Sequence, residues 1–396
     1  MCEEHLKTLS ISMIAPFGIR PKGTLSARML PLAQALTRRG HHVCIIAPAT
    51  LNPEDADTTQ RLSGVRVLHT RLPRLPGPLG VFEQAWLLRA HALADQTDIV
   101  HLFKPKGFGG LAVLAKSSLP LVVDSDDWEG WGGWNELLPY PQSAKLLFDW
   151  QEHDLPRRAR AVTVVSRTLE RQVRGLGVPA ERIFYVPNGS ALASLSGGQL
   201  GAGRDGKRFV LYSRFWEFSV HEFVVELMAI FSQQPEARLC IIGKGEHGEE
   251  QELLRLAARA GIADKLESYG WVEPERIPGL LAACDIALVP MQNTLLNRAR
   301  GLAKLLELMQ AGLAIVAHDV GQVGEYLRHE HSAVLVDSRH SGALAGAAIH
   351  VLEDRALQLR LGQAAQQAAQ HFSWSKLAAR VEEAYFFAAG DGSFEF

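Results

Sequence analysis

The sequence has few cysteines, no long apolar run and almost no net charge, and each shortage excludes a class of protein. Its four cysteines are scattered without CxxC spacing, at positions 2, 44, 240 and 284. Three of them lie in apolar runs, which indicates reduced core thiols and not a disulfide frame or a zinc site. No run approaches the ~18 apolar residues of a membrane span. Any membrane contact is therefore expected to be peripheral.

The formal net charge of -2 argues against a general nucleic-acid binder. The first ten residues contain Glu3 and Glu4 and no long apolar block, so we expect no signal peptide. A cytoplasmic protein is predicted, with peripheral contact at the inner membrane face as a further expectation. The chain has 396 residues and 47% hydrophobic content, which favours two domains over one.

Strand and helix patterns alternate from the start of the chain. Residues 9–15 predict a strand, residues 16–23 form a glycine and proline loop, and a helical apolar stripe follows up to Gly40. The next strand is expected at 42–47. This βαβ unit implies a parallel sheet with right-handed crossovers. Further strands are predicted at 65–69, 99–103, 119–124, 161–165, 183–186, 209–213, 238–242, 266–269, 286–290, 314–317 and 333–336.

The alternation is interrupted once, by a serine- and glycine-rich segment that reads as a linker. We therefore predict two Rossmann-like, doubly wound α/β domains that face a central cleft. The expected parts are an N-terminal domain (1–190), a linker (191–206), a C-terminal domain (207–373) and a closing helix (374–396).

One stretch, residues 297–312, carries an unusual charge order. Wound as a helix, it places apolar residues on one side and Arg300, Lys304 and Glu307 on the other. Cations at a helix start oppose the helix dipole unless an anion binds there, and a phosphate or diphosphate suits such a site. Glu307 would then meet a hydroxylated group such as a ribose. The alternative is a solvated face with an i, i+3 pair of Lys304 and Glu307.

The order of short motifs along the chain resembles the GT-B glycosyltransferases, and within them the large retaining family 4. The resemblance covers nearly the whole chain and implies that the closing helix crosses back onto the N-terminal domain. Its marks are the glycine loop and helix at 18–40, Val186-Pro-Asn-Gly189, Leu211-Tyr-Ser-Arg214, Ile241-Ile-Gly-Lys-Gly245, Tyr269-Gly-Trp-Val272, Ala283-Cys-Asp-Ile-Ala-Leu-Val-Pro290, Lys304-Leu-Leu-Glu307 and Phe372-Ser-Trp374.

The resemblance implies transfer of a hexose from a UDP- or GDP-sugar to a hydroxyl acceptor, with retention and without a metal cofactor. Cations can stabilise the charge that develops on the leaving diphosphate. Glu307 corresponds to the residue that binds the donor ribose, and Arg214 to the basic residue that faces the diphosphate. The predicted catalytic residues are His101, Asp126, Arg214 and Lys304. The implied donor-binding residues are Gly23, Gly243, Gly245, Val272, Arg300, Gly301, Leu302 and Glu307.

Two departures from the family pattern keep other functions open. The first glutamate of the Glu-x7-Glu motif is replaced by Ala299, and the lysine expected soon after Arg214 is absent. Retention is therefore not secured by the motifs. A sugar-nucleotide epimerase of the same fold and a non-catalytic nucleotide-sugar-binding subunit remain alternatives.

The acceptor is expected at the N-terminal domain and could be a glycan, a lipid-linked sugar or a small molecule. His101, read as a strand end, could lie near the reacting sugar, although a lone histidine there is more often structural. The flexible Asp and Trp loop at 124–135 could bind acceptor hydroxyls or stack on a sugar. An Asp-capped turn with buried tryptophans and a metal-binding Asp-x-Asp are the alternatives. The predicted acceptor-binding residues are Lys104, Asp124, Asp127, Trp128 and Trp131.

Overall fold

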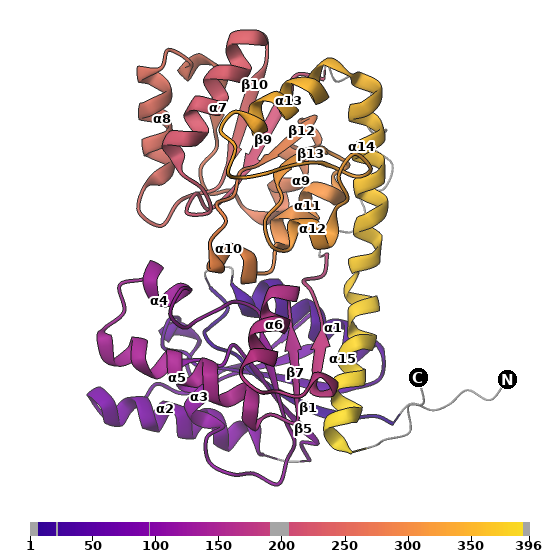
Figure 1. Ribbon diagram of the computed structural model, residues 1–396. Helices are drawn as coiled ribbons and strands as arrows, with labels where there is room; N and C mark the ends of the chain where they lie inside the picture. The colour runs from indigo at the N-terminus through magenta and orange to yellow at the C-terminus, as the bar shows by residue number, and fades with distance from the viewer. Residues whose placement is uncertain (1–6, 21–22, 95, 191–205, 391–396) are drawn as a thin grey trace, which may run out of the picture. The chain divides into compact units, whose positions relative to one another are not determined.

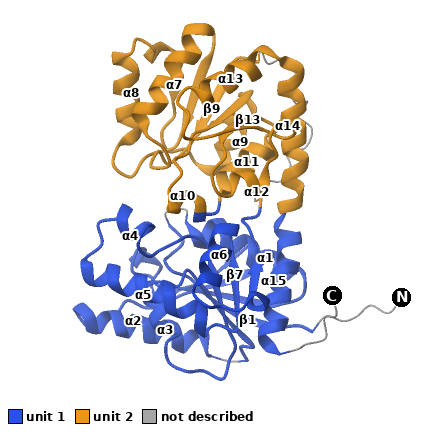
Figure 2. Ribbon diagram, viewed as in Figure 1, with its two compact units in different colours: residues 1–189, 299–301, 373–396 blue, residues 190–298, 302–372 orange. Residues whose placement is uncertain are grey.

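The computed structural model describes residues 7–20, 23–94, 96–190 and 206–390, which form two compact α/β units (Figure 1). Unit 1 takes in residues 1–189, 299–301 and 373–396, and unit 2 takes in residues 190–298 and 302–372 (Figure 2). Most of the expected linker, residues 191–205, lies outside the described residues. Each unit is a layered structure of helices on a mainly parallel sheet, as the alternation of patterns predicts.

The described part of unit 1 contains an eight-stranded sheet in the order β3-β4-β2-β1-β5-β6-β7-β8. Every pair is parallel except the edge pair β3 and β4. The strands are β1 (Ser10–Ile14), β2 (His42–Ala47), β3 (Thr59–Leu62), β4 (Val65–His69), β5 (Ile99–Phe103), β6 (Leu121–Ser125), β7 (Ala161–Val164) and β8 (Ile183–Tyr185). The helices are η1 (Leu25–Met29), α1 (Leu30–Arg38), η2 (Pro53–Asp55), α2 (Gly77–Ala92), α3 (Gly107–Ala112), α4 (Trp134–Leu137), α5 (Gln142–Arg158), α6 (Arg167–Gly175), η3 (Ala180–Arg182) and α15 (Trp374–Ala389).

The C-terminal helix α15 belongs to unit 1 and completes its core. Its apolar residues pack with those of α1 and of the sheet in one buried cluster. Polar contacts hold it in register: the Glu382 carboxylate accepts from Arg39 at 2.5 and 2.6 Å and lies 2.8 Å from Nε2 of His41. The chain end therefore stabilises the first half of the protein.

The described part of unit 2 contains a six-stranded parallel sheet in the order β11-β10-β9-β12-β13-β14. The strands are β9 (Arg208–Tyr212), β10 (Arg238–Ile242), β11 (Leu266–Ser268), β12 (Ile286–Val289), β13 (Ala314–His318) and β14 (Val334–Val336). The helices are α7 (Val220–Gln233), α8 (Glu249–Arg259), η4 (Ala263–Lys265), η5 (Pro274–Arg276), α9 (Ile277–Ala282), α11 (Ala303–Gln310), α12 (Val323–Tyr326), α13 (Ala343–Glu353), α14 (Arg355–Ala369) and η6 (Gln370–Phe372), and α10 (Leu295–Ala299) ends in the segment grouped with unit 1.

Two hydrophobic cores lie on the two faces of the unit 2 sheet, because successive side chains of a strand point to opposite faces. In β9, Phe209 and Leu211 enter one core and Val210 enters the other. Helices α7, α8 and α13 supply the first core, and α9, α11 and α12 supply the second. The near-continuous apolar strands follow from this two-sided burial.

The structure corrects the sequence prediction at three places. The antiparallel edge strand β3 was not predicted, because its residues Thr59–Leu62 are mostly polar and lack a buried face. The first helix begins with the π-helical segment η1 and becomes α-helical only at Leu30. The helix expected over residues 297–312 is two helices, α10 and α11, with a break at residues 300–302.

Candidate functional site

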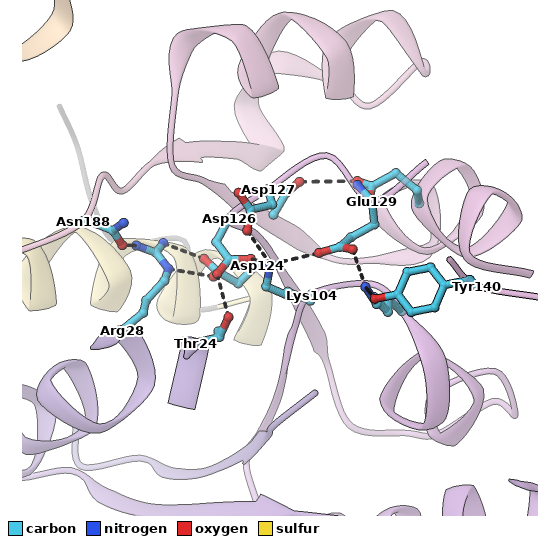
Figure 3. Close-up of polar contacts among 12 residues, drawn as sticks. Thr24, Arg28, Lys104, Asp124, Asp126, Asp127, Glu129, Tyr140 and Asn188 are labelled. Atoms are coloured by element: carbon cyan, nitrogen blue, oxygen red, sulfur yellow. Dashed lines mark hydrogen bonds and ion pairs between the residues drawn. The ribbon is translucent and has the colours of Figure 1, made fainter. Parts of the chain in front are cut away.

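A group of charged side chains lies at the carboxyl ends of two neighbouring strands of unit 1 (Figure 3). Lys104 follows β5 directly, Asp124 lies in β6, and Asp126 and Asp127 follow β6. The carboxyl ends of parallel strands are where α/β folds bind their ligands. The structure brings Lys104, Asp126 and Asp127 together, and their predicted roles toward an acceptor stay predictions.

Asp124 forms a buried ion pair with Arg28 of η1. Arg28 donates from Nε and Nη2 to the two carboxylate oxygens, each at 2.7 Å, and Thr163 Oγ1 donates to Oδ1 at 2.5 Å. Arg28 also donates to the Val186 carbonyl at 2.9 Å and to Asn188 Oδ1 at 3.1 Å. Burial raises the pKa of Asp124, but Arg28 outweighs that effect and the pKa is lowered. Because its oxygens are already occupied, Asp124 acts first as an anchor for this edge of the sheet.

The π-helical turn brings Thr24 and Arg28 to face two carboxylates at once. A π-helix closes i→i+5 hydrogen bonds, and the Leu30 N–H donates to the Leu25 carbonyl in this way. Thr24 Oγ1 donates to Asp126 Oδ2 at 3.1 Å, while Arg28 binds Asp124. Asp124 and Asp126 are two residues apart, as are side chains on one face of a strand. Single π-turns are frequent at functional sites.

Lys104 is the cation at the centre of this group. Its backbone is left-handed, with φ of 58°, a conformation that costs a non-glycine residue on the order of 1 kcal/mol. Its Nζ lies 2.5 Å from Asp127, 2.8 Å from Glu129 and 3.3 Å from Asp126 Oδ1. Burial lowers the pKa of Lys104, but these carboxylates together raise it well above its ordinary value. The ammonium therefore stays charged in the interior.

Lys106 and Glu129 extend the group toward Tyr140. Lys106 Nζ donates to Glu129 at 2.5 Å and to the Tyr140 hydroxyl at 3.1 Å. Burial raises the pKa of Glu129, but the two lysines outweigh it and lower the pKa to about 2. The Glu129 N–H donates to Glu152 at 3.0 Å, and burial followed by the charge of Glu129 raises the pKa of Glu152 well above its usual range.

Asp126 is the member of the group whose charge can change near neutral pH. Burial raises its pKa to about 7, although the Lys104 charge opposes that shift. A carboxyl group with such a pKa can accept or return a proton at working pH.

His101 lies in the middle of β5 and is fully buried, so its expected place at a strand end is wrong. Its Nδ1 lies 2.8 Å from the Tyr385 hydroxyl of α15, and its ring packs 4.2 Å from that of Phe103. Burial lowers the pKa of His101 to about 4, so the ring is neutral near pH 7. The geometry supports a structural contact with α15, and the catalytic role of His101 stays a prediction.

The tryptophans of the 124–135 segment have different environments. Trp128 and Trp134 are buried, and the Trp128 Nε1–H donates to the Trp131 carbonyl at 2.8 Å. A side chain at Gly133 would lie 2.0 Å from the Trp128 carbonyl oxygen, so the turn is tight and needs glycine. The expectation that Trp128 sits on a flexible loop is therefore wrong. Trp131 is 41% exposed and remains able to touch an acceptor.

In unit 2, the loop after β9 holds Arg214 at the surface. The Glu217 carboxylate accepts from Ser213 Oγ at 2.7 Å and from the Arg214 N–H at 3.1 Å, and Phe215 adopts a positive φ of 70°. The Arg214 guanidinium forms an ion pair with Glu246. This arginine is anchored through its backbone, and a diphosphate would have to compete with Glu246 for its side chain.

Two glycines near Arg214 bring backbone segments close together. Gly243 has φ of 126°, and a Cβ there would lie 1.9 Å from the Ser213 carbonyl oxygen. A Cβ at Gly245 would lie 2.2 Å from Glu249 Oε2. The Val272 side chain is buried in the core, so any base contact of that residue is made by its backbone. The donor roles of these three residues stay predictions.

Helix α11 carries the predicted donor residues Lys304 and Glu307 on its half-buried side, above a buried face of Leu305, Leu306 and Met309. Lys304 Nζ lies 4.8 Å from the centre of the Tyr212 ring. Leu302 caps the helix, and its N–H donates to Gln322 Oε1 at 2.7 Å. Because α11 begins at Ala303, Lys304 lies in its first turn, whereas Arg300 lies before the helix.

The break before α11 changes the expected position of the other predicted residues. Arg300 and Gly301 group with unit 1, where a Cβ at Gly301 would lie 2.4 Å from Asn188 Nδ2. Ala299 is fully buried. Gly23, a predicted donor contact, accepts from the Ala27 N–H at 2.8 Å and so helps to start η1. Among the described residues, no group of three or more His, Cys, Asp or Glu side chains is arranged to hold a metal ion.

Comparison with protein families decides the assignment. Residues 23–189 match the glycosyl transferase 4-like domain, and residues 199–368 match the glycosyl transferases group 1. The chain belongs to the family-4-like, group 1 glycosyltransferases. It is therefore an enzyme of the GT-B class that moves a sugar from a nucleotide-diphosphate sugar to an acceptor, as the motifs predict.

Related enzymes match this glycosyltransferase over almost its whole length. It is 27% identical to the phosphatidyl-myo-inositol mannosyltransferase of Mycobacterium tuberculosis over 97% of this chain and 98% of that protein. It is 24% identical to the D-inositol 3-phosphate glycosyltransferase of Pseudarthrobacter chlorophenolicus over 96% and 94% of the two chains.

Solved structures support the GT-B fold. Sucrose-phosphate synthase of Thermosynechococcus elongatus matches with a TM-score of 0.74 and 19% identity over 95% of this chain and 98% of that chain. HepE of Anabaena, solved with UDP and glucose, matches with a TM-score of 0.70 and 19% identity over the same shares.

The sequence prediction missed several polar residues of this glycosyltransferase. Arg28 lies four residues before Leu32 of the apolar stripe, so an arginine at a core-facing position was a usable signal. Tyr212 stands within the Leu211-Tyr-Ser-Arg214 motif and ends β9. Glu129 and Glu152 are separated by 23 residues. No short-range pattern joins these two, because only the fold brings them together.

Proposed function

We propose that this glycosyltransferase transfers mannose, with retention, from GDP-mannose to a hydroxyl of a phosphorylated inositol carried by a lipid. The observation that carries the proposal is the nearly full-length match to enzymes named for phosphatidyl-myo-inositol and for D-inositol 3-phosphate. A further relative is named a GDP-mannose-dependent alpha-(1-6)-phosphatidylinositol monomannoside mannosyltransferase, and it is 24% identical over 87% of this chain. The shared chemistry is an inositol ring with a phosphate.

The donor part of the proposal assigns charge stabilisation to unit 2. Arg214 and Lys304 are cations placed near loops and helix starts that α/β folds use for phosphates. They would stabilise the negative charge that develops on GDP as the sugar–phosphate bond breaks. Glu307 would accept hydrogen bonds from the ribose hydroxyls. Arg214 is the more exposed of the two cations, which supports its reach to the diphosphate.

The acceptor part of the proposal assigns proton handling to Asp126 of unit 1. An attacking hydroxyl must lose its proton, and a carboxyl group with a pKa of about 7 is suited to receive it. Lys104 beside it would stabilise the ionised form of Asp126 from which the proton is accepted. The exposed indole of Trp131 would pack on the acceptor ring.

An exposed apolar surface on helix α2 supports a lipid-borne acceptor. Leu79, Phe82 and Trp86 are 60%, 62% and 61% exposed and are spaced three and four residues apart, so they share one helix face. The nearby Glu83 carboxylate is occupied by the Arg71 guanidinium and by the Arg74 and Leu75 N–H groups. Apolar residues with nearby cations suit peripheral contact with an anionic bilayer. No described helix is long and apolar enough to span a membrane.

The proposal is tested by supplying GDP-mannose and other nucleotide sugars with vesicles of phosphatidylcholine that contain or lack phosphatidylinositol. We expect GDP release and mannosylated lipid only when GDP-mannose and phosphatidylinositol are both present. Sugar conversion without any acceptor would favour an epimerase instead, and binding without turnover would favour a non-catalytic subunit. Transfer to a soluble acceptor alone would remove the lipid from the proposal.

The α2 surface is tested by Phe82→Glu with Trp86→Glu. We expect weaker cosedimentation with the vesicles and slower transfer to phosphatidylinositol, while the affinity for GDP, measured by calorimetry, is kept. Val225→Glu is the matched control, because Val225 is an exposed apolar residue of unit 2 at 56% exposure. Equal loss in the control and in the α2 variant would contradict a specific role for this surface.

A further inference from the structure

Tyr212 connects the two donor residues of helix α11. The ammonium group of Lys304 lies over its ring, 4.8 Å from the ring centre. The Glu307 carboxylate lies near its hydroxyl: burial first, and then the charge and hydrogen bonding of Glu307, raise the pKa of the Tyr212 phenol. One aromatic side chain of β9 therefore contacts two side chains that stand three residues apart on another element.

The position of Tyr212 in the fold makes this contact rigid. Tyr212 is the last residue of β9, and its backbone is paired with Ile242 at the end of β10. Its ring is half-buried and packs on the core that contains Leu305, Leu306 and Met309 of α11. Long, unbranched side chains lose rotamer freedom at a cost when they are ordered. A fixed ring beneath Lys304 reduces what must be ordered when a ligand arrives.

The aromatic ring suits a lysine that must bind an anion. The face of a tyrosine ring attracts an ammonium group through its quadrupole and carries no full negative charge. A carboxylate in the same place would neutralise the cation and compete with a diphosphate. The phenol, by contrast, can donate a hydrogen bond to the Glu307 carboxylate and so fix the direction of that side chain.

We propose that Tyr212 is a positioning residue of the donor site, which holds Lys304 toward the donor diphosphate and orients Glu307 toward the donor ribose. The inference rests on the donor assignment proposed above for these two residues. It adds that the hydroxyl and the ring of Tyr212 have separable effects. The hydroxyl acts through Glu307 on donor binding, and the ring acts through Lys304 on the charge of the leaving diphosphate.

The test compares Tyr212→Phe, Tyr212→Leu and the control Tyr269→Phe in the full-length enzyme. Tyr269 is matched because it also lies at the end of a strand of the unit 2 sheet, directly after β11, and its hydroxyl lies 3.4 Å from a glutamate, Glu267. For Tyr212→Phe we expect the donor KM to rise about 3- to 10-fold, which is the effect of one net hydrogen bond, with kcat nearly unchanged. For Tyr212→Leu we expect kcat also to fall about 3- to 10-fold.

Thermal unfolding of each variant separates positioning from stability. A raised KM in Tyr212→Phe with an unchanged Tm supports the inference. A kcat that is lowered in Tyr212→Leu but close to the wild-type value in Tyr212→Phe supports it as well. Kinetics of Tyr212→Phe equal to those of Tyr269→Phe would overturn it, as would parallel losses of Tm, kcat and affinity. If the wild-type enzyme turns over no donor, the proposed function fails by itself. The affinity of GDP and UDP for the same variants, measured by calorimetry, then still decides the role of Tyr212.

Discussion

Arg28 and Asp124 form a bidentate ion pair inside unit 1, with both nitrogen to oxygen distances at 2.7 Å and both side chains almost fully buried. The same guanidinium reaches the Val186 and Pro187 carbonyls, so it ties the end of β8 to β6. A buried pair of this kind adds little net stability over an apolar pair, but the removal of one partner strands the other charge.

Asp124→Ala should therefore destabilise the protein strongly. We expect the free energy of unfolding, measured with urea, to fall by about 3–5 kcal/mol, because Arg28 is left buried and unpaired. Glu54→Ala is the control, since Glu54 pairs with Arg20 at the exposed surface. The urea midpoint of the control should hardly move. Equal small effects in the two variants would mean that water reaches Arg28.

The stability of the protein should depend on pH through Asp126. Its pKa is about 7 in the folded protein, above the usual aspartate value of about 3.9 in an unfolded chain. The folded state thus holds a proton that the unfolded chain releases, so this group favours folding at low pH, and its contribution is lost as pH rises from about 4 through about 7. Asp126→Asn should lose less stability than the wild type between about pH 5 and pH 8.

Urea unfolding at both pH values measures this difference. The histidine His101, with its pKa of about 4, acts in the opposite direction, but it is present in both proteins and cancels in the comparison. The amide of the Asp126→Asn variant keeps an oxygen for Thr24 and still lies beside Lys104, so the fold should persist. Parallel pH profiles for the two proteins would contradict the raised pKa.

Sequence reasoning reached the architecture because apolar periodicity is local. The strands His42–Ala47, Val65–His69, Ile99–Phe103 and Arg238–Ile242 have the predicted bounds, since each is a short segment of mainly apolar or alternating residues between polar turns. The helix predicted at 297–312 was wrong because a local pattern does not reveal that Gly301 packs against Asn188 and Val165, where a Cβ would not fit. Charged networks such as Lys104 with Glu129 were also missed, because they depend on the pairing of distant segments.

Glu307→Ala should weaken donor binding without unfolding the protein. Glu307 is half-buried on α11, and its loss removes the carboxylate proposed to bind the ribose. We expect the donor KM to rise by about tenfold or more, as for the loss of hydrogen bonds to a charged group. Glu275→Ala, at an exposed glutamate of the same unit, is the control for calorimetric titration with GDP and UDP. Unchanged affinity in Glu307→Ala would remove the ribose assignment.

Arg214 and its partner Glu246 should give opposite effects. Arg214→Ala removes a cation from the diphosphate and should lower turnover more than stability, as should Lys304→Ala. Glu246→Gln removes the carboxylate that competes for Arg214, and donor affinity should rise. Steady-state kinetics with a saturating acceptor measures each variant. If all three variants keep wild-type kinetics, the proposed diphosphate contacts are not made.

Treatment with EDTA should leave most of the activity intact. The charge on the leaving diphosphate is assigned to Arg214 and Lys304, so a divalent cation is not needed for that step. In unit 1, Arg28 holds both oxygens of Asp124, and Thr24 and Lys104 contact Asp126, so a metal would have to displace these groups. Initial rates of the dialysed enzyme with EDTA, with Mg²⁺ and with Mn²⁺ are to be compared. A strict requirement of the wild type for either ion, together with the loss of that metal-dependent activity in Asp124→Asn, would contradict this expectation. It would instead assign Asp124 and Asp126 to a metal-bound nucleotide.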